Sequence, residues 1–131
     1  MRALIAEDEF LNRKVLSAFL APLFEVDVAV TGKEAVDAFR LAHDEARPYD
    51  IIFMDIMMPE MDGIEALTAI RAAEREGRIK PQAKVLMVTA VDDPKTVIRS
   101  FHDGEASGYI VKPFHKGRLF EELKKLGFLT E

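Results

Sequence analysis

The stretch IIFMDIMMPEMDGIEALTAI, residues 51–70, decides the fold. Its first four residues, Ile51–Met54, form an apolar run with the length and β-branched character of a buried strand. Asp62 and Glu65 then have the spacing of a helix capping box. Apolar residues follow at helical spacing: Ile64, Leu67 and Ile70. The stretch predicts one strand–helix unit, with Asp55 at the point where the strand ends.

The same alternation extends outward over the whole chain. Four more short apolar runs are predicted to be strands: Ala3–Ala6, Val26–Val30, Val85–Val88 and Tyr109–Val111. Four further stripes have helical spacing: Leu11–Leu23, Ala35–Phe39, Val97–Phe101 and Leu119–Leu126. Strands alternating with helices build a parallel sheet with helices on both faces. We therefore expect one α/β domain over residues 1–131 with a five-stranded parallel sheet.

Composition limits the classes of protein. A chain of 131 residues with 49% hydrophobic residues suits one folded domain. A net charge of −5 argues against a direct nucleic-acid surface, and the absence of cysteine excludes disulfides, thiolate metal sites and cysteine nucleophiles. The apolar runs are too short for a signal peptide or a membrane span. We expect a cytoplasmic protein without membrane insertion.

Polar side chains follow four of the five predicted strands. Glu7 and Asp8 follow the first strand, Asp55 the third, Thr89 the fourth and Lys112 the fifth. The carboxyl ends of parallel strands lie along one edge of the sheet, so these residues should converge there. Three neighbouring carboxylates need a proton or a cation, and oxygen ligands alone favour Mg²⁺. The histidines, by contrast, occupy polar settings and form no metal constellation: His43, His102 and His115.

Several residues of the loop after Asp55 are expected to have structural rather than chemical roles. Asp62 is expected to cap the following helix, and Gly63 to permit an unusual turn before it. Three methionines of this loop are expected to pack against the core: Met57, Met58 and Met61.

Four segments together resemble the receiver domain of two-component response regulators: Ile5–Glu9, Met54–Gly63, Val88–Ala90 and Gly108–Phe114. The D-x-x-M-P-x-M-D-G segment followed by K-P-F is specific, although each piece alone would be weak. The resemblance covers nearly the whole chain. It implies a flavodoxin-like (βα)5 fold with three α/β/α layers and strand order 2-1-3-4-5.

The resemblance also implies the chemistry of the site. Asp55 would be the phosphorylation site, accepting a phosphoryl group from a sensor histidine kinase, a phosphotransfer protein or a small donor. Asp8 and Asp55 would bind Mg²⁺ directly, Glu7 through water, and Met57 through its backbone carbonyl. These roles fit phosphoryl transfer, in which the protein mainly positions the reacting groups and neutralises their charge.

Further residues would contact the phosphoryl group and respond to it. By resemblance, Thr89 and Lys112 would contact its oxygens, and Lys112-Pro113 would be a cis peptide. Thr89 and Tyr109 would form a switch that changes the surface of the fourth helix, fifth strand and fifth helix, about Asp93–Leu126, for binding a downstream protein or a second copy.

The expected function is that of a signalling phosphoacceptor, not of an enzyme with a separate substrate. Met57 and Val91 are apolar at positions where polar side chains could orient water, which predicts slow self-dephosphorylation. The chain could be a stand-alone, chemotaxis-type receiver or the N-terminal receiver of a longer regulator.

Three alternatives remain open at this level. A haloacid-dehalogenase-type phosphohydrolase would also use an aspartate and Mg²⁺, but it wants a second aspartate where Met57 stands. A nucleotide-binding module would need a glycine-rich phosphate loop, and neither G-x-x-x-x-G-K-[ST] nor G-x-G-x-x-G occurs. A receiver-like module that only binds partners is disfavoured because all five site residues are present.

Overall fold

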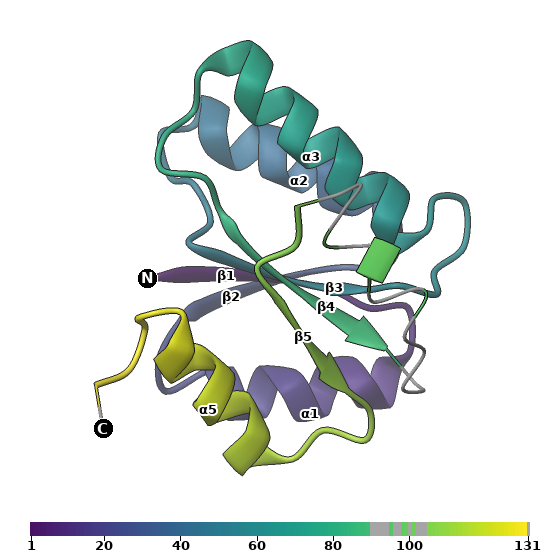
Figure 1. Ribbon diagram of the computed structural model, residues 1–131, viewed down its shortest axis with the longest axis vertical. Coiled ribbons are helices and arrows are strands. Elements are labelled where there is room, and N and C mark those ends of the chain that lie inside the picture. The colour runs from purple at the N-terminus through teal and green to yellow at the C-terminus, as the bar shows by residue number, and fades with distance from the viewer. Residues whose placement is uncertain (90–94, 96–97, 100, 102–104, 131) are drawn as a thin grey trace.

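A parallel sheet forms the centre of the molecule (Figure 1). The structure is a computed structural model that describes residues 1–89, 95, 98–99, 101 and 105–130. Its five strands run in the order β2-β1-β3-β4-β5. They span Arg2–Ala6 (β1), Glu25–Ala29 (β2), Ile51–Asp55 (β3), Lys84–Thr89 (β4) and Gly108–Val111 (β5). The predicted fold class and strand order are therefore confirmed, although β2 ends one residue before the predicted Val30.

Helices cover both faces of the sheet. They are α1 (Phe10–Leu20), α2 (Gly32–Asp44), α3 (Gly63–Gly77) and α5 (Lys116–Lys125). Figure 1 shows α2 and α3 on one face and α1 and α5 on the other. Of the predicted helix over Val97–Phe101, residues 97 and 100 lie outside the described residues, whereas Ile98, Arg99 and Phe101 are helical. Within the described residues, no helix is both long enough and apolar enough to cross a membrane.

The central strand β3 is buried along its whole length. Its side chains alternate between two core clusters. Ile52 and Met54 join the cluster beneath α2 and α3, whereas Ile51 and Phe53 join the cluster beneath α1 and α5. This burial on both faces explains the continuous apolar run, and it fixes the position of Asp55 at the end of the strand.

Helix α1 corrects one prediction. The expected stripe over Leu11–Leu23 made Leu11 and Val15 core residues, but these are 71% and 41% exposed. The fully buried residues of α1 are Leu16 and Leu20. Residues five apart point in directions roughly 140° apart on a helix, so a face centred on Leu16 turns Leu11 outward. The helix also ends at Leu20.

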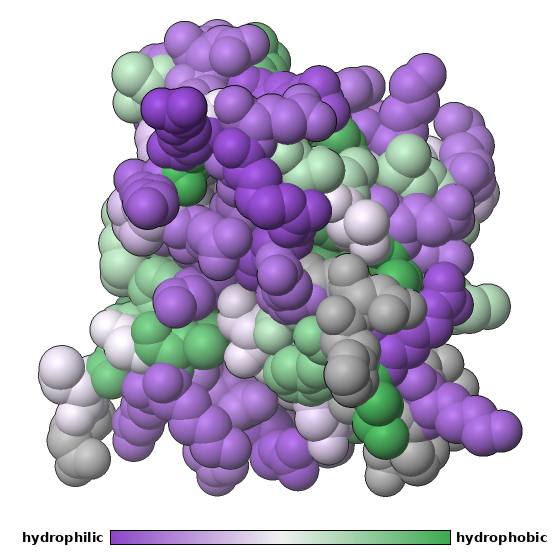
Figure 2. All heavy atoms as spheres, turned by 45° about the horizontal axis from the view of Figure 1, so that its top comes forward, coloured by the Kyte–Doolittle hydropathy of each residue, from purple (hydrophilic) through white to green (hydrophobic). Residues whose placement is uncertain are grey.

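Helices α2 and α3 begin at side-chain caps. The Thr31 hydroxyl accepts a hydrogen bond from the backbone N–H of Glu34 at 3.0 Å. Asp62 and Glu65 form the full capping box, with distances of 2.8 and 3.2 Å. The predicted Asp62–Glu65 capping box is therefore confirmed, and it fixes where the loop after Asp55 ends. The face that carries α2 and α3 is largely hydrophilic outside (Figure 2).

Candidate functional site

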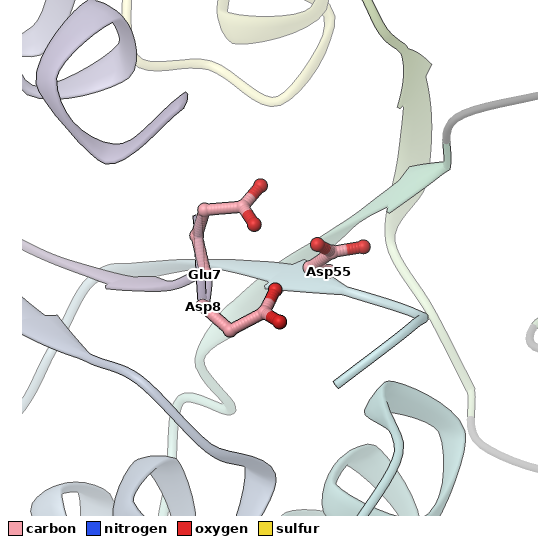
Figure 3. A group of neighbouring side chains, drawn as sticks. All are labelled: Glu7, Asp8 and Asp55. Carbon is pink, nitrogen blue, oxygen red and sulfur yellow. The ribbon is translucent and has the colours of Figure 1, made fainter. Parts of the chain in front are cut away.

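Strand register brings the acidic residues together. Ala6 of β1 pairs with Met54 of β3, so the residues that follow them, Glu7 and Asp55, lie at the same level. Asp8 comes next in the chain, before α1 begins. One carboxylate oxygen from each of Glu7, Asp8 and Asp55 lies within 4.8 Å of the others (Figure 3). The sequence prediction of an acidic cluster at this edge is therefore confirmed as a matter of placement.

The same edge receives residues from β4 and β5. Asp55 pairs with Val88, and the next residue, Thr89, pairs with Val111. Lys112 follows Val111, and its backbone N–H donates a 2.7 Å hydrogen bond to the carbonyl of Thr89. The Thr89 side chain is buried with the residue only 7% exposed. Register alone thus brings β4 and β5 residues beside the acids.

Lys112 joins two of the carboxylates. Its Nζ lies 2.8 Å from Glu7 Oε1 and 2.9 Å from Asp55 Oδ2. The other oxygen of Asp55 accepts a 3.2 Å hydrogen bond from the backbone N–H of Met57. Glu7 and Asp55 are 2% and 3% exposed. Both oxygens of the Asp55 carboxylate therefore have a defined partner.

Burial and charge shift the pKa values of this cluster. Burial, followed by the neighbouring Asp55 carboxylate, raises the pKa of Glu7, against the opposing effect of Lys112. Burial alone would lower the pKa of Lys112, but its contacts with Glu7 and Asp55 outweigh that effect and raise it. Three carboxylates face one ammonium, so an excess of negative charge remains at this edge.

The donor set fits a hard divalent cation. The three clustered carboxylates, Glu7, Asp8 and Asp55, offer oxygen atoms only. Two of the residues are buried and Asp8 is exposed, so the cluster is open to solvent on one side. Mg²⁺ binds through one or two carboxylates and keeps part of its water shell. The residues present are those that such an ion needs.

Tyr109 lies farther from this edge. It belongs to β5, pairs with Met87, and is half-buried against the core cluster beneath α2 and α3. The Lys112-Pro113 bond is cis, as the resemblance implied. The structure also has a cis bond at Lys80-Pro81, which the sequence did not predict.

Two expectations about the loop after Asp55 were wrong. Met58 and Met61 pack against the core, but Met57 is 75% exposed and does not. Gly63 is required by close approach rather than by an unusual turn, since a Cβ there would lie 2.2 Å from the carbonyl oxygen of Asp55. The start of α3 therefore packs directly on the end of β3.

One contact of the site was missed in the sequence. The Arg13 side chain, on α1, donates hydrogen bonds to the backbone carbonyls of Glu7 and Asp8. The signal available was a basic residue one helical turn past the acidic pair, because helical side chains point toward the N-terminus. His43 and His115 are exposed as expected, whereas His102 lies outside the described residues.

Comparison with known proteins identifies the family. The response regulator receiver domain model matches residues 3–124. This chain belongs to the response regulator receiver domain family. It is 38% identical over 127 residues to the chemotaxis protein CheY of Listeria monocytogenes, covering 95% of this chain and 97% of that protein.

Solved structures agree. A chain of the CheX–CheY–BeF3–Mg²⁺ complex from Borrelia burgdorferi is 27% identical with a TM-score of 0.84, covering 99% of this chain and 90% of that chain. A chain of the Saccharomyces cerevisiae complex of Ypd1 with the receiver domain of Ssk1 is 25% identical with a TM-score of 0.86, covering 97% and 88%. The receiver domain described here is thus a signalling phosphoacceptor of the two-component type, and receiver domains bind Mg²⁺ at an acidic pocket of this kind.

Proposed function

We propose that Asp55 is the phosphoacceptor of this receiver domain and that the edge around it is the Mg²⁺-dependent phosphorylation site. The observation that carries this proposal is the contact of the Lys112 ammonium with both Asp55 and Glu7, at 2.9 and 2.8 Å. A buried carboxylate held between a cation and a backbone N–H is oriented before the donor arrives. Orientation and charge neutralisation are the main requirements of phosphoryl transfer.

The proposed reaction is a transfer from nitrogen to oxygen. A carboxylate oxygen of Asp55 attacks the phosphorus of a phosphohistidine, the P–N bond breaks, and its electron pair stays on the imidazole nitrogen. The product is an aspartyl phosphate and a free histidine on the donor. Lys112 would offset negative charge on the phosphoryl oxygens, and the Thr89 hydroxyl would donate a hydrogen bond to one of them.

Four residues would hold the Mg²⁺ ion. Asp8 and Asp55 would bind through carboxylates, Glu7 through a water molecule, and Met57 through its backbone carbonyl. When bound, the ion supplies positive charge that offsets the carboxylates and the incoming phosphoryl group. The support in this chain is the cluster of three carboxylates within 4.8 Å.

A change in conformation would carry the signal. The charge added at Asp55 would draw Thr89 inward, and Tyr109 would follow. Tyr109 is half-buried, so its ring would have room to turn further inward only if its surroundings change. The affected surface would comprise β5, α5 and the segment that begins near Asp93, part of which lies outside the described residues.

The phosphodonor would dock beside the acidic edge. Helix α1 begins just after Asp8 and exposes three apolar side chains, with Phe10 59%, Leu11 71% and Val15 41% exposed. Exposed apolar groups that adjoin a charged site are typical of docking surfaces. A sensor histidine kinase or a phosphotransfer protein would be the donor, as Ypd1 is found bound to the Ssk1 receiver domain.

Residues 1–131 would form one receiver domain, since the family model spans residues 3–124. The protein would act on its own aspartate and not as an enzyme on a separate substrate. It would work in the cytoplasm, either alone or as the N-terminal part of a longer regulator.

Phosphotransfer profiling tests the proposal. The purified protein is mixed with each phosphorylated sensor kinase of its host, and transfer is followed over time. We expect rapid transfer from one or a few kinases, and loss of transfer in Asp55→Asn. Asp37→Asn, an exposed carboxylate on α2, is the matched control and should accept phosphate normally. Transfer to Asp55→Asn at the rate of the unmodified protein would refute the assignment.

A further inference from the structure

The turn between β1 and α1 is held by one side chain. Nη1 of Arg13 donates hydrogen bonds to the carbonyl oxygens of Glu7 at 3.0 Å and Asp8 at 2.9 Å. The backbone N–H of Arg13 also donates to the carbonyl of Glu9 at 3.0 Å. A single residue of α1 thus binds three consecutive carbonyl groups of the turn that carries two of the three clustered acids.

Other restraints on this turn are few. Glu9 is the N-cap of α1, but its side chain makes no capping hydrogen bond, and the first turn of α1 has no acidic residue. Among the described residues, the other bonds that fix the turn join the Glu7 N–H to the carbonyl of Ala29 and the Glu9 N–H to Oε2 of Glu7. Among the hydrogen bonds of the described residues, the one from Arg13 is the only one that restrains the backbone of Asp8.

Charge alone would argue against an arginine here. A guanidinium keeps its positive charge at all ordinary pH values, and it would repel a cation bound at the neighbouring carboxylates. In the described part of the chain, no carboxylate lies within ion-pair distance of Arg13. Its hydrogen bonds go to carbonyl groups, so they shape the backbone and do not occupy the carboxylate oxygens.

We infer that Arg13 is a positioning residue of the Mg²⁺ site, which holds the Glu7–Asp8 turn in the conformation that aims both carboxylates toward Asp55. The inference rests on the proposed function, because it takes that cluster to be the metal site. The inference predicts the direction in which Mg²⁺ affinity changes. Removal of this positive charge should weaken Mg²⁺ binding, whereas a purely electrostatic effect would strengthen it.

Lys14 provides a matched control. Its Nζ lies 5.6 Å from the centre of the Phe10 ring, and Cζ of Arg13 lies 5.7 Å from the same centre. Both residues therefore carry one positive charge beside the same aromatic ring at the start of α1. Only Arg13 donates to the carbonyls of the acidic turn among the bonds of the described residues. The pair separates the effect of the hydrogen bonds from the effect of charge.

The experiment is a titration of the intact protein with Mg²⁺, followed by the amide chemical shifts of residues near 7–9 and 55–57. For Arg13→Met we expect Mg²⁺ affinity to fall about tenfold or more, as is usual when a group that orients metal ligands is removed. Lys14→Met should bind Mg²⁺ as well as the unmodified protein or slightly better. Arg13→Lys keeps the charge and one donor group, and should restore part of the affinity.

The outcomes are distinguishable. Equal or tighter Mg²⁺ binding by Arg13→Met would overturn the inference. This holds even if the melting temperature of the variant falls, because a lower melting temperature alone would show only a structural role. Asp8→Asn tests the metal site itself, and it should lose binding. If the unmodified protein bound no Mg²⁺, or Asp8→Asn bound it normally, the proposed site would be refuted together with the inference. If Arg13→Met does not fold, Arg13→Lys decides: unchanged affinity contradicts the role of the two-carbonyl contact.

Discussion

At the scale of single residues, Lys112 offsets part of the negative charge of the site. Its ammonium contacts Glu7 and Asp55, and its side chain is largely buried. The side chain is 15% exposed, so solvent screens these contacts only weakly. Without Lys112, the buried carboxylates would repel each other, because no other cation of the described residues forms an ion pair with Glu7 or Asp55.

This leads to a prediction for Lys112→Met. The free energy of unfolding should fall by about 2–3 kcal/mol, somewhat less than for a fully buried pair because part of Lys112 is exposed. Added Mg²⁺ should raise the melting temperature of the variant more than that of the unmodified protein, since the ion replaces the lost charge. Lys84→Met, an exposed lysine at the start of β4, is the control. An equal response of both variants to Mg²⁺ would contradict this view of Lys112.

Met57 controls the lifetime of the phosphoryl group in our interpretation. Its side chain is 75% exposed beside Asp55 and offers no polar atom that could orient water. Met57→Asn should therefore shorten the half-life of the aspartyl phosphate several-fold, and adding Val91→Glu, whose position lies outside the described residues, should shorten it further. The half-life is measured by loss of the phosphorylated form after donor removal. Little or no change in the double variant would dismiss the idea.

At the scale of elements, a buried ion pair within α3 holds the segments that precede β4 and β5. Arg71 and Glu74 are 3% and 2% exposed, and their charged atoms lie 2.7 Å apart. Arg71 also donates to the carbonyls of Ala83 and Glu105, and Glu74 accepts the N–H of Ala83 at 2.8 Å. The pair thereby fixes the segments that lead into β4 and β5, the strands that carry Thr89 and Lys112.

Breaking this pair on one side should be costly. Arg71→Met leaves Glu74 buried without its cation, which typically costs about 3–5 kcal/mol of unfolding free energy. The double variant Arg71→Met with Glu74→Gln should recover part of this loss, because the amide stays neutral and still accepts from Ala83. Urea unfolding of the two single variants and the double variant measures the coupling. Additive effects would show that the two side chains do not act as a pair.

The elements also show what sequence patterns can and cannot predict. Strand β3 and the Asp62 cap depend on neighbours within a few residues, so the pattern located both. The buried face of α1 depends on which side of the helix meets β1 and β2, and the apolar stripe in the sequence was too broad to identify that side. Leu11 was assigned to the core for that reason, although it is exposed. The Arg13 contacts required the path of the turn in three dimensions.

At the scale of the whole molecule, the two edges of the sheet differ. The carboxyl edge carries the acidic cluster, whereas the opposite edge has a network around Arg2. Arg2 pairs with Asp27 at 2.6 Å, and the Tyr49 hydroxyl donates to the same Asp27 oxygen at 2.7 Å. Tyr49 also lines a hollow of about 680 Å³ at this edge. The network is structural and lies away from the proposed site.

The network makes a pH-dependent prediction. Burial and then Asp27 raise the pKa of Tyr49 from 10 to about 12. The folded protein thus holds this proton more tightly than the unfolded chain, so the stabilisation is complete below about pH 10 and is lost as pH rises toward 12. The difference in unfolding free energy between the unmodified protein and Tyr49→Phe should therefore shrink by roughly 2 kcal/mol between pH 10 and pH 12. A difference independent of pH would contradict the assignment, and phosphorylation near neutral pH should be unaffected.

The site as a whole was largely predictable because register follows from a parallel sheet. Once the strands were located, Glu7, Asp55 and Lys112 had to meet at one edge. The exposure of Met57 and the close packing that requires Gly63 were not predictable. Both depend on the three-dimensional path of the loop between β3 and α3. The family resemblance supplied the roles, and the distances supply the physical grounds for them.

The most direct test is phosphorylation by a small donor. The protein is incubated with acetyl phosphate and Mg²⁺, and the mass of the intact chain is measured alongside Asp55→Asn and Asp37→Asn. We expect one added phosphoryl group on the unmodified protein and on Asp37→Asn, and none on Asp55→Asn or when the metal is chelated. A phosphoryl group on Asp55→Asn, or on the unmodified protein without divalent metal, would contradict the central claim that Asp55 accepts phosphate at a Mg²⁺-dependent site.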